Sequence, residues 1–380
     1  MMIFDYETLR IIWWAFLGFL IIGFAIMGGY DLGVGILLPF LGKNDDERRV
    51  ILNSIGSTWE GNQVWFVMAG GALFAAWPTV YAVTFSSFYF ALLFALFALF
   101  LRPLGFDYRS KVATPLWREN WDRALFVGGF VPSLVLGIAF GNLLKGIPFY
   151  FESDMRIIYS GTFWGLLNPF ALLTGLLSLS MFTMHGAIYL QIKTIDSINR
   201  RAKKAVLIFT IATLVLFALG GLWVVNLDGY HITSEVLTNG ASNPLTKFVK
   251  REPGLWLDNY GHLPGLWAIP IATFISGIIA LVLSRADKPG TAFVFSSVTI
   301  ATIILTTACS MFPFLIPSSL SLNSSLTVWD ASSSIKTLSV MFWATVIFLP
   351  LIIVYTSWVF RVLRGKVTVD HIRKNNHTLY

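Results

Sequence analysis

The stretch IIWWAFLGFLIIGFAIMGGYDLGVGILLPFL, residues 11–41, decides the class of fold. It contains one charged residue, Asp31. A helix of this length exceeds the roughly 20 residues needed to cross a hydrocarbon core about 30 Å thick. We therefore expect a membrane-spanning helix here, tilted or bent near Gly28, Gly29 or Gly33.

Similar apolar runs recur along the chain, and they predict an all-α polytopic membrane protein with about nine transmembrane helices. Hydrophobic residues make up 56% of the sequence and charged residues 12%, about half the charged share of a soluble domain. Residues 1–380 are expected to form a single transmembrane helical domain. The nine spans are placed at 11–41, 51–75, 79–101, 124–144, 163–190, 205–225, 264–283, 291–312 and 337–360.

The basic residues indicate the orientation of these spans. With the N-terminus outside, 20 of the 27 Lys and Arg residues fall in inner segments and none falls within a span. Because inner loops of membrane proteins are enriched in basic residues, we expect the N-terminus outside and the C-terminus inside. The net charge of +7 thus reports topology and requires no nucleic-acid partner. The longest outer segment, 226–262, is expected to pack over the outer face of the bundle.

Two acids lie inside the first predicted hairpin. Asp31 and Glu60 are each about ten residues, or about 15 Å, from the inner end of their spans. Below Glu60, a predicted helix places Asn53 and Ser57 on the same face, at intervals of four and three residues. Since ionisable groups in a bilayer usually face a cavity, a partner or water, these four residues are candidates for a proton path from the inside. The alternative is a structural hydrogen bond between helices, with both acids protonated.

The sequence offers little for binding a metal. Cys309 is the single cysteine and cannot form an internal disulfide. His185 is the one histidine within a span, and we expect it near the inner interface, bonded to backbone or lipid. A haem ligand pair of His185 with Met181 or Met184 is the alternative. We predict no metal site and no catalytic residue on this chain.

Two tryptophans flank Glu60. Trp59 and Trp65 are candidates for a quinone or cofactor contact, and simple packing between helices is the alternative. Their positions alone do not distinguish the two roles.

The segment Trp59-Glu60-Gly61-Asn62-Gln63-Val64-Trp65, followed by GGALFAAWP at 70–78, resembles a motif of a known family. The chain is similar, essentially from end to end, to subunit II of the cytochrome bd-type quinol oxidases, bacterial terminal oxidases that reduce dioxygen to water. Asn62 of the motif joins Trp59 and Trp65 as a cofactor-adjacent candidate. Further matching stretches lie at 44–49, 106–109, 140–144, 168–170, 311–314 and 326–330.

The resemblance implies a role within a larger complex. In that family the haem ligands and the quinol-oxidising loop belong to subunit I. Subunit II packs against it as a heterodimer and completes the environment of haem b595 and haem d. A cytoplasmic proton path is proposed to include the acid of the motif, which is Glu60 here. The expected setting is an electrogenic oxidase in the bacterial cytoplasmic (inner) membrane, with quinol as substrate, a bound quinone as a further candidate ligand, and one or more small single-span subunits.

The sequence departs from the family pattern at three positions. Gly28 replaces a usual acid, Thr58 a frequent histidine, and His185 a glutamine. A different class of function, a proton- or cation-coupled membrane transporter, would also explain acids inside the membrane. Transporters often contain inverted repeats, and we find none in this sequence. Haem d absorption and quinol-dependent oxygen consumption distinguish the two classes.

Overall fold

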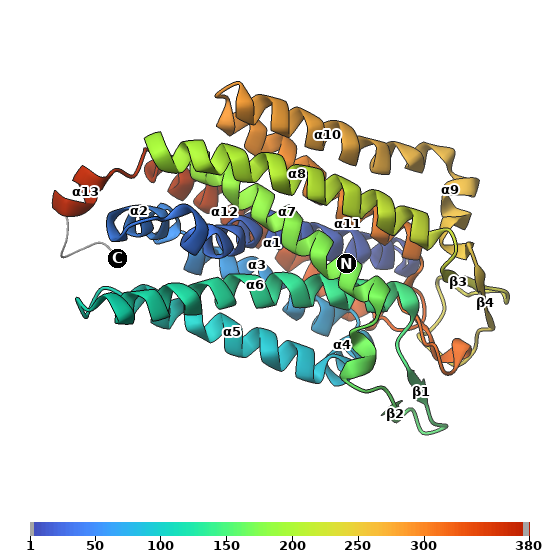
Figure 1. Cartoon of the computed structure of the whole chain (residues 1–380). Coiled ribbons are helices and arrows are strands. Elements are labelled where there is room, and N and C mark those ends of the chain that lie inside the picture. The colour runs from blue at the N-terminus through green and yellow to red at the C-terminus, as the bar shows by residue number, and fades with distance from the viewer. Residues whose placement is uncertain (1–3, 375–379) are drawn as a thin grey trace.

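A bundle of long helices forms the body of the protein (Figure 1). The structure is a computed structural model that describes residues 4–374 and residue 380. One end of the bundle holds α2, α13 and the C-terminus, and the other holds the strands. The helices are α1 (Tyr6–Leu41), α2 (Asp45–Ile55), α3 (Trp59–Ala76), α4 (Pro78–Ser87), α5 (Tyr89–Tyr108), α6 (Pro115–Lys145), α7 (Pro169–Lys193), α8 (Asp196–Val224), α9 (Asp258–His262), α10 (Ala268–Arg285), α11 (Pro289–Met311), α12 (Ile335–Val362) and α13 (Val369–Lys374).

Three short antiparallel hairpins cover the end of the bundle opposite the C-terminus. They are β1 (Phe149–Phe151) with β2 (Ile157–Tyr159), β3 (Asp228–Ile232) with β4 (Val249–Pro253), and β5 (Phe314–Ile316) with β6 (Leu326–Thr327). The segment expected to cover this end, 226–262, contains β3 and β4. It is anchored by Trp256, whose indole nitrogen donates to the carbonyl of Leu144 at 2.9 Å.

Eight helical segments in the described part of the chain are long and apolar enough to cross a membrane. They are α1, α5, α6, α7, α8, α10 together with the turn before it, α11 and α12. The prediction of a polytopic all-α protein is therefore confirmed. The additional predicted span corresponds to α3, which falls outside this set because its first turns carry Glu60, Asn62 and Gln63.

The prediction of one continuous helix over 51–75 is wrong. The chain forms α2, turns at 56–58, and starts α3 at Trp59. A hydrogen bond from the Thr58 amide to the Ile55 carbonyl closes the turn. Asn53, Ser57 and Glu60 therefore do not form a stripe on one helix.

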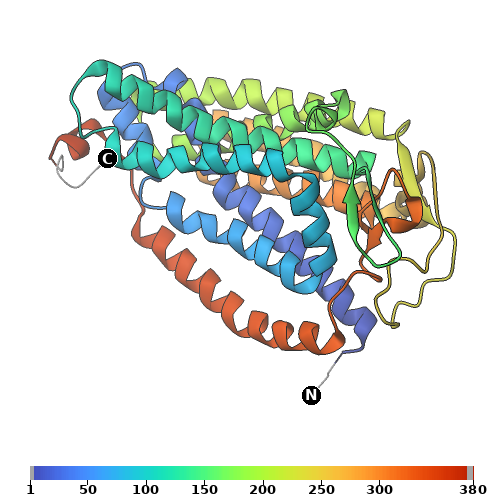
Figure 2. The same cartoon turned by 90° about the horizontal axis from the view of Figure 1, so that it is seen from below.

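The predicted span 79–101 is also interrupted. It begins as α4 behind Pro78, a residue favoured in the first turn of a helix because it needs no hydrogen-bond donor there. The helix breaks at Phe88 and continues as α5 in a different direction (Figure 2). The short helix α4 packs against β2 and β5.

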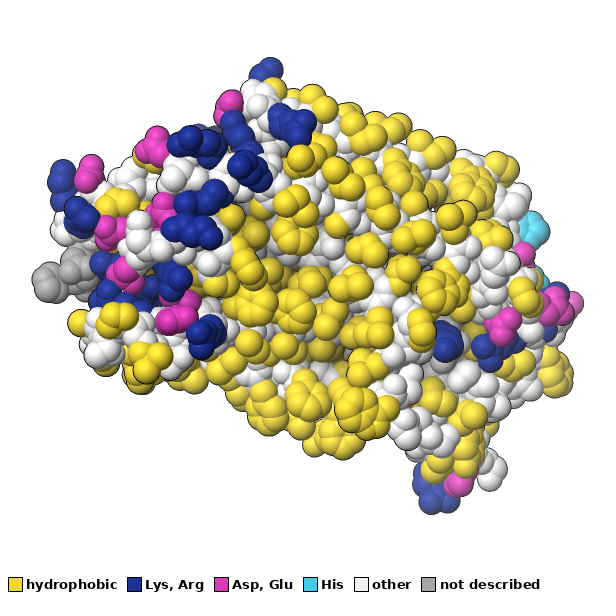
Figure 3. Space-filling view, viewed as in Figure 1, with side chains coloured by type: hydrophobic (Ala, Val, Ile, Leu, Met, Phe, Trp, Pro, Cys, Tyr) yellow, Lys and Arg dark blue, Asp and Glu magenta, His cyan; other side chains and the backbone are white. Residues whose placement is uncertain are grey.

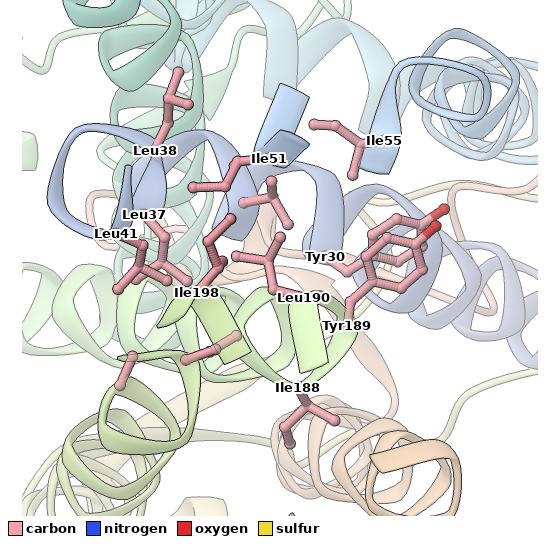
Figure 4. Packing of buried hydrophobic residues seen from close by; sticks show 14 of the residues in the cluster. Tyr30, Leu37, Leu38, Leu41, Ile51, Ile55, Ile188, Tyr189, Leu190 and Ile198 are labelled. Atoms are coloured by element: carbon pink, nitrogen blue, oxygen red, sulfur yellow. The ribbon is translucent and has the colours of Figure 1, made fainter. Parts of the chain in front are cut away.

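Backbone contact between α1 and α7 lies at the centre of the bundle. A Cβ atom added to Gly33 would lie 2.0 Å from the Phe182 carbonyl oxygen, and one added to Gly186 would lie 2.6 Å from the Gly33 carbonyl carbon. Glycine is therefore required on both helices for this approach. Around the contact, Tyr30 and Tyr189 lie face to face beside a cluster of Leu and Ile side chains (Figure 4).

The end of the bundle that holds α2 is rich in charge, and an apolar belt separates it from the strand end (Figure 3). Asp122, at the start of α6, binds Arg109 at 2.6 Å and Arg48 at 2.9 Å. Arg201 binds Glu47 at 2.6 Å. Burial alone would raise the pKa of Glu47, but hydrogen bonds from Arg201 and Ser197 outweigh it and hold that pKa below its ordinary value. These ion pairs fasten α2 to α6 and α8.

We predict that Asp122→Asn destabilises the protein by about 3–5 kcal/mol, because it leaves the buried guanidinium of Arg109 with only the more exposed Asp45, 3.0 Å away, as a counter-charge. The side chains of Asp122 and Arg109 are each only 1% exposed. Thermal unfolding of the purified protein in detergent measures the loss. As a control, Glu119→Gln removes an exposed ion pair on the same helix and is expected to cost less than about 1 kcal/mol. Equal losses in the two variants would contradict the assignment.

Candidate functional site

A buried polar cluster surrounds Asp31. This residue lies within α1 and is fully buried. The side-chain amide of Asn62, on α3, donates to Asp31 Oδ2 and to the Tyr30 hydroxyl, both at 2.7 Å. Tyr30 in turn donates to the Thr58 hydroxyl at 3.2 Å. Thr58 thus accepts from Tyr30 and in turn donates to the Ile55 carbonyl at 3.2 Å.

Arg102 supplies the positive charge of this cluster. The prediction that no basic residue falls within a span is wrong at this position, because Arg102 lies buried inside α5, one of the eight membrane-spanning segments. Its guanidinium carbon is 5.5 Å from the centre of the Trp59 ring, and its charge acts on Asp31. A Cβ atom on Gly128 would lie 2.8 Å from Arg102 Cγ, so the arginine stem occupies space that glycine leaves free.

The cluster contains three buried polar atoms without a hydrogen-bond partner in the described chain. They are Asp31 Oδ1 and the two terminal nitrogens of Arg102. A buried charge is costly unless it is compensated. The opposite charges of Asp31 and Arg102 provide that compensation, and the three free atoms can bind water between them.

Glu60 lies on the opposite side of α3 from Asn62. Residues two positions apart in an α-helix, such as these, are separated by about 200° around the helix axis and by about 3 Å along it. The two acids are therefore at similar depth, as predicted, but Asp31 faces the interior and Glu60 faces outward. Glu60 is exposed, and within the described residues it makes no hydrogen bond or ion pair.

The C-terminal residue completes the surroundings of Asn53. The Asn53 side chain bonds the backbone of Tyr380 through two hydrogen bonds of 2.8 and 3.0 Å. Tyr380 also packs against Phe106 and interacts electrostatically with Glu60. Ser57 is exposed in the turn between α2 and α3. Local sequence patterns gave no signal for Tyr380, because its contacts are with residues far away in the sequence.

The two candidate tryptophans have packing partners within the chain. Trp65 is buried, and its ring occupies the space beside Gly23, where a Cβ atom would lie 2.5 Å away. Trp59 stacks on Phe106 with ring centres 5.0 Å apart. Each ring thus helps to hold α3 against its neighbours.

His185 is not at the interface, and that expectation was wrong. It is fully buried; its Nδ1 lies 2.8 Å from the Ser296 hydroxyl, and its ring stacks on Phe293 at 4.3 Å. Its other ring nitrogen, Nε2, is buried without a hydrogen-bond partner among the described residues. Among the described residues there is no group of three or more His, Cys, Asp or Glu side chains that could hold a metal ion.

These features define a multi-pass membrane protein with ionisable groups both buried between its helices and exposed on an outer helix face. The chain belongs to the cytochrome bd terminal oxidase subunit II family, whose profile matches residues 9–363. It is a component of a bd-type quinol:oxygen oxidoreductase of the bacterial inner membrane. This membership excludes the transporter alternative and brings haem to the complex.

Curated relatives cover almost the whole chain. It is 50% identical to cytochrome bd-I ubiquinol oxidase subunit 2 of Escherichia coli K12, over 99% of this chain and 100% of that protein. Identity is 48% to a probable cytochrome oxidase subunit 2 of Haemophilus influenzae, over 99% and 100%. The bd oxidase structure from Geobacillus thermodenitrificans superposes with a TM-score of 0.70 at 16% identity, covering 93% of this chain and 98% of that one, which shows a shared fold.

We predict that Arg102→Met strongly destabilises the protein, by about 3–5 kcal/mol, because it leaves Asp31 as an uncompensated buried acid. Asp31→Asn is expected to be destabilising for the complementary reason. The double variant should be more stable than the sum of the single losses predicts. Thermal unfolding of all four proteins tests this, and strictly additive losses would show that the two groups are not coupled.

Proposed function

We propose that this chain packs through the outer face of α3 against subunit I and delivers protons there through Glu60. The observation that carries the proposal is the unpaired carboxyl of Glu60 on an outward helix face. A carboxyl group facing lipid is costly, so such a group usually faces a protein partner or a water path. Subunit I would be such a protein partner, and its haems would be the destination of the protons.

The outer face of α3 also contains residues suited to packing against a second helix. Glu60, Val64, Val67, Gly71 and Phe74 are all exposed and follow one another at intervals of four, three, four and three residues. This spacing places them along one side of α3. A Cβ atom on Gly71 would meet no atom within 4 Å, so the chain itself does not use this glycine for packing. A glycine on an open helix face favours close approach of a second helix at that point.

We further propose that α3 makes a ninth crossing, with the N-terminus outside and the C-terminus inside. The support is the concentration of Lys and Arg at the end that holds α2 and α13, together with the positive-inside rule (Figure 3). In this orientation Asn53, Ser57 and Tyr380 lie at the cytoplasmic end, below Glu60. Protons would reach Glu60 along these polar groups. Asp31, with Arg102 beside it, is the inner relay candidate.

The ligands of haem b595 and haem d are assigned to subunit I. The assignment follows the family resemblance; in this chain the buried imidazole of His185 contacts Ser296 through Nδ1 and stacks on Phe293. We assign the bound quinone to an apolar cavity of about 260 Å³ between α1, α3 and α12, beside the proposed interface. The quinol-oxidising site is assigned to subunit I, and the small single-span subunits to the remaining apolar helix faces.

Glu60→Gln is expected to lower quinol-driven oxygen consumption by about 100-fold, the effect of losing a group that accepts and donates protons. Glu60→Asp keeps the acid and should retain most of the activity. The measurements are oxygen uptake and haem d absorbance of the purified complex. Wild-type values for both in Glu60→Gln would remove Glu60 from the proton path.

Gly71→Leu is expected to weaken association with subunit I at least tenfold, because the larger side chain separates helices that approach closely. The matched control is Gly221→Leu on α8, where a Cβ atom also meets nothing within 4 Å. Co-purification of the two subunits from membranes, compared with the amount of this chain inserted, measures the effect. If both variants assemble as the wild type does, the interface lies elsewhere.

A further inference from the structure

A second cavity opens at the basic end of the bundle, between α1, α7, α11 and α12, with a volume of about 510 Å³. Apolar side chains from all four helices line it, among them Met27, Ile192, Phe293 and Phe360. The stacked rings of Tyr30 and Tyr189 close one side, with ring centres 4.0 Å apart (Figure 4). Both tyrosine hydroxyls already donate to other groups of the chain. The interior of the cavity is thus suited to hydrocarbon.

Three cations stand among the lining residues, and no acid does. Lys193 Nζ donates to the carbonyl of Leu363 at 2.6 Å. Lys366 Nζ donates to the carbonyls of Gln191 and Thr194 at 2.9 and 3.0 Å. An ammonium group has three donors, so each lysine keeps at least one for a ligand.

Arg364 is the third cation. It is exposed and makes no hydrogen bond or ion pair within residues 4–374 and 380. The carboxylate that acts on Lys366, Asp287, is itself paired with Lys203. The lining therefore carries an excess of positive charge next to an apolar interior.

The position of α12 explains why an occupant is needed. Leu338, near the start of this helix, is its one buried residue. The cavity lies at the other end, beside Phe360, where α12 runs along the edge of the bundle (Figure 2). An apolar ligand would cover surface on α12 and α7 that the chain leaves open.

We propose that this cavity binds one anionic glycerophospholipid, with its phosphate on Arg364, Lys193 and Lys366 and the first part of an acyl chain in the apolar interior. A free phosphate would satisfy the cations and leave the interior unfilled, whereas a neutral lipid would leave the cations unpaired. In the orientation proposed above, on which this step rests, the headgroups of the inner leaflet lie at the basic end of the bundle. The lipid would join α12 to α7 and α11.

Native mass spectrometry of the whole oxidase, purified in mild detergent and then washed with excess detergent, tests the proposal. We expect the wild type to retain one phospholipid, and Arg364→Gln to lower the retained fraction by about tenfold, the effect of losing a charge-assisted hydrogen bond. Arg285→Gln is the matched control, since Arg285 is exposed at the end of α10, outside the cavity. Equal retention in Arg364→Gln and the wild type, or equal loss in both variants, would overturn the proposal.

A second variant separates a lipid from a free anion. Ile192→Trp fills part of the cavity and leaves the cations in place, so it should also release the lipid. Retention that depends on Arg364 and is unaffected by Ile192→Trp would show that only the phosphate is bound, which contradicts the proposed acyl site. Recovery of a quinone in place of a phospholipid, in an amount equal to the complex and lost in Ile192→Trp, would likewise overturn it.

Discussion

Contact between the backbones of α1 and α7 determines where the rest of the bundle lies. Lipid provides no hydrophobic force between helices, so close packing supplies much of the attraction. Gly33 and Gly186 meet at distances that exclude any larger side chain. On the next face of α1, Gly129 of α6 makes a similar contact, since its Cβ would lie 2.6 Å from the Leu32 carbonyl oxygen. With α1 held on two sides, Tyr30 and Asp31 have fixed positions and defined partners.

This fixed helix explains why the two acids have different environments. Asp31 faces into the bundle, so it is compensated from inside by Asn62 and Arg102. Glu60 lies on the same short helix as Asn62, and the geometry that turns Asn62 inward turns Glu60 outward. The break at 56–58 makes this orientation possible, because the faces of α3 need not continue those of α2. One side of α3 therefore contacts the interior of this chain, and its other side is open for contact with subunit I.

The long apolar runs made the helices predictable, because a bilayer leaves the backbone few alternatives to a helix. The break at Phe88 was not predictable from hydropathy, since the residues on both sides are mostly apolar. The break at 56–58 lies in a polar stretch that interrupts the apolar run, and the prediction carried one helix through it. Depth could be counted along the chain, which is why Asp31 and Glu60 were placed at a common level. Their faces could not be assigned without the α1–α3 contact. His185 and Arg102 were misplaced for the same reason: a polar residue near the end of an apolar run can lie inside or outside the bundle, and only its neighbours decide.

The outward surfaces indicate what the isolated chain lacks. Inside the bundle, the space beside a glycine is occupied by neighbouring backbone or by an aromatic ring, as at Gly33, Gly186 and Gly23. Along α3, a Cβ atom added to Gly61, Gly70 or Gly71 would meet no atom within 4 Å. A glycine inside a helix lowers the stability of the helix by about 1 kcal/mol relative to alanine. Close packing of a second helix against the glycine offsets this loss. The same reasoning separates the two open regions, because α3 carries one acid and no basic residue, whereas three cations stand among the residues that line the cavity at α12. The first therefore suits a helix of subunit I, and the second suits a charged lipid.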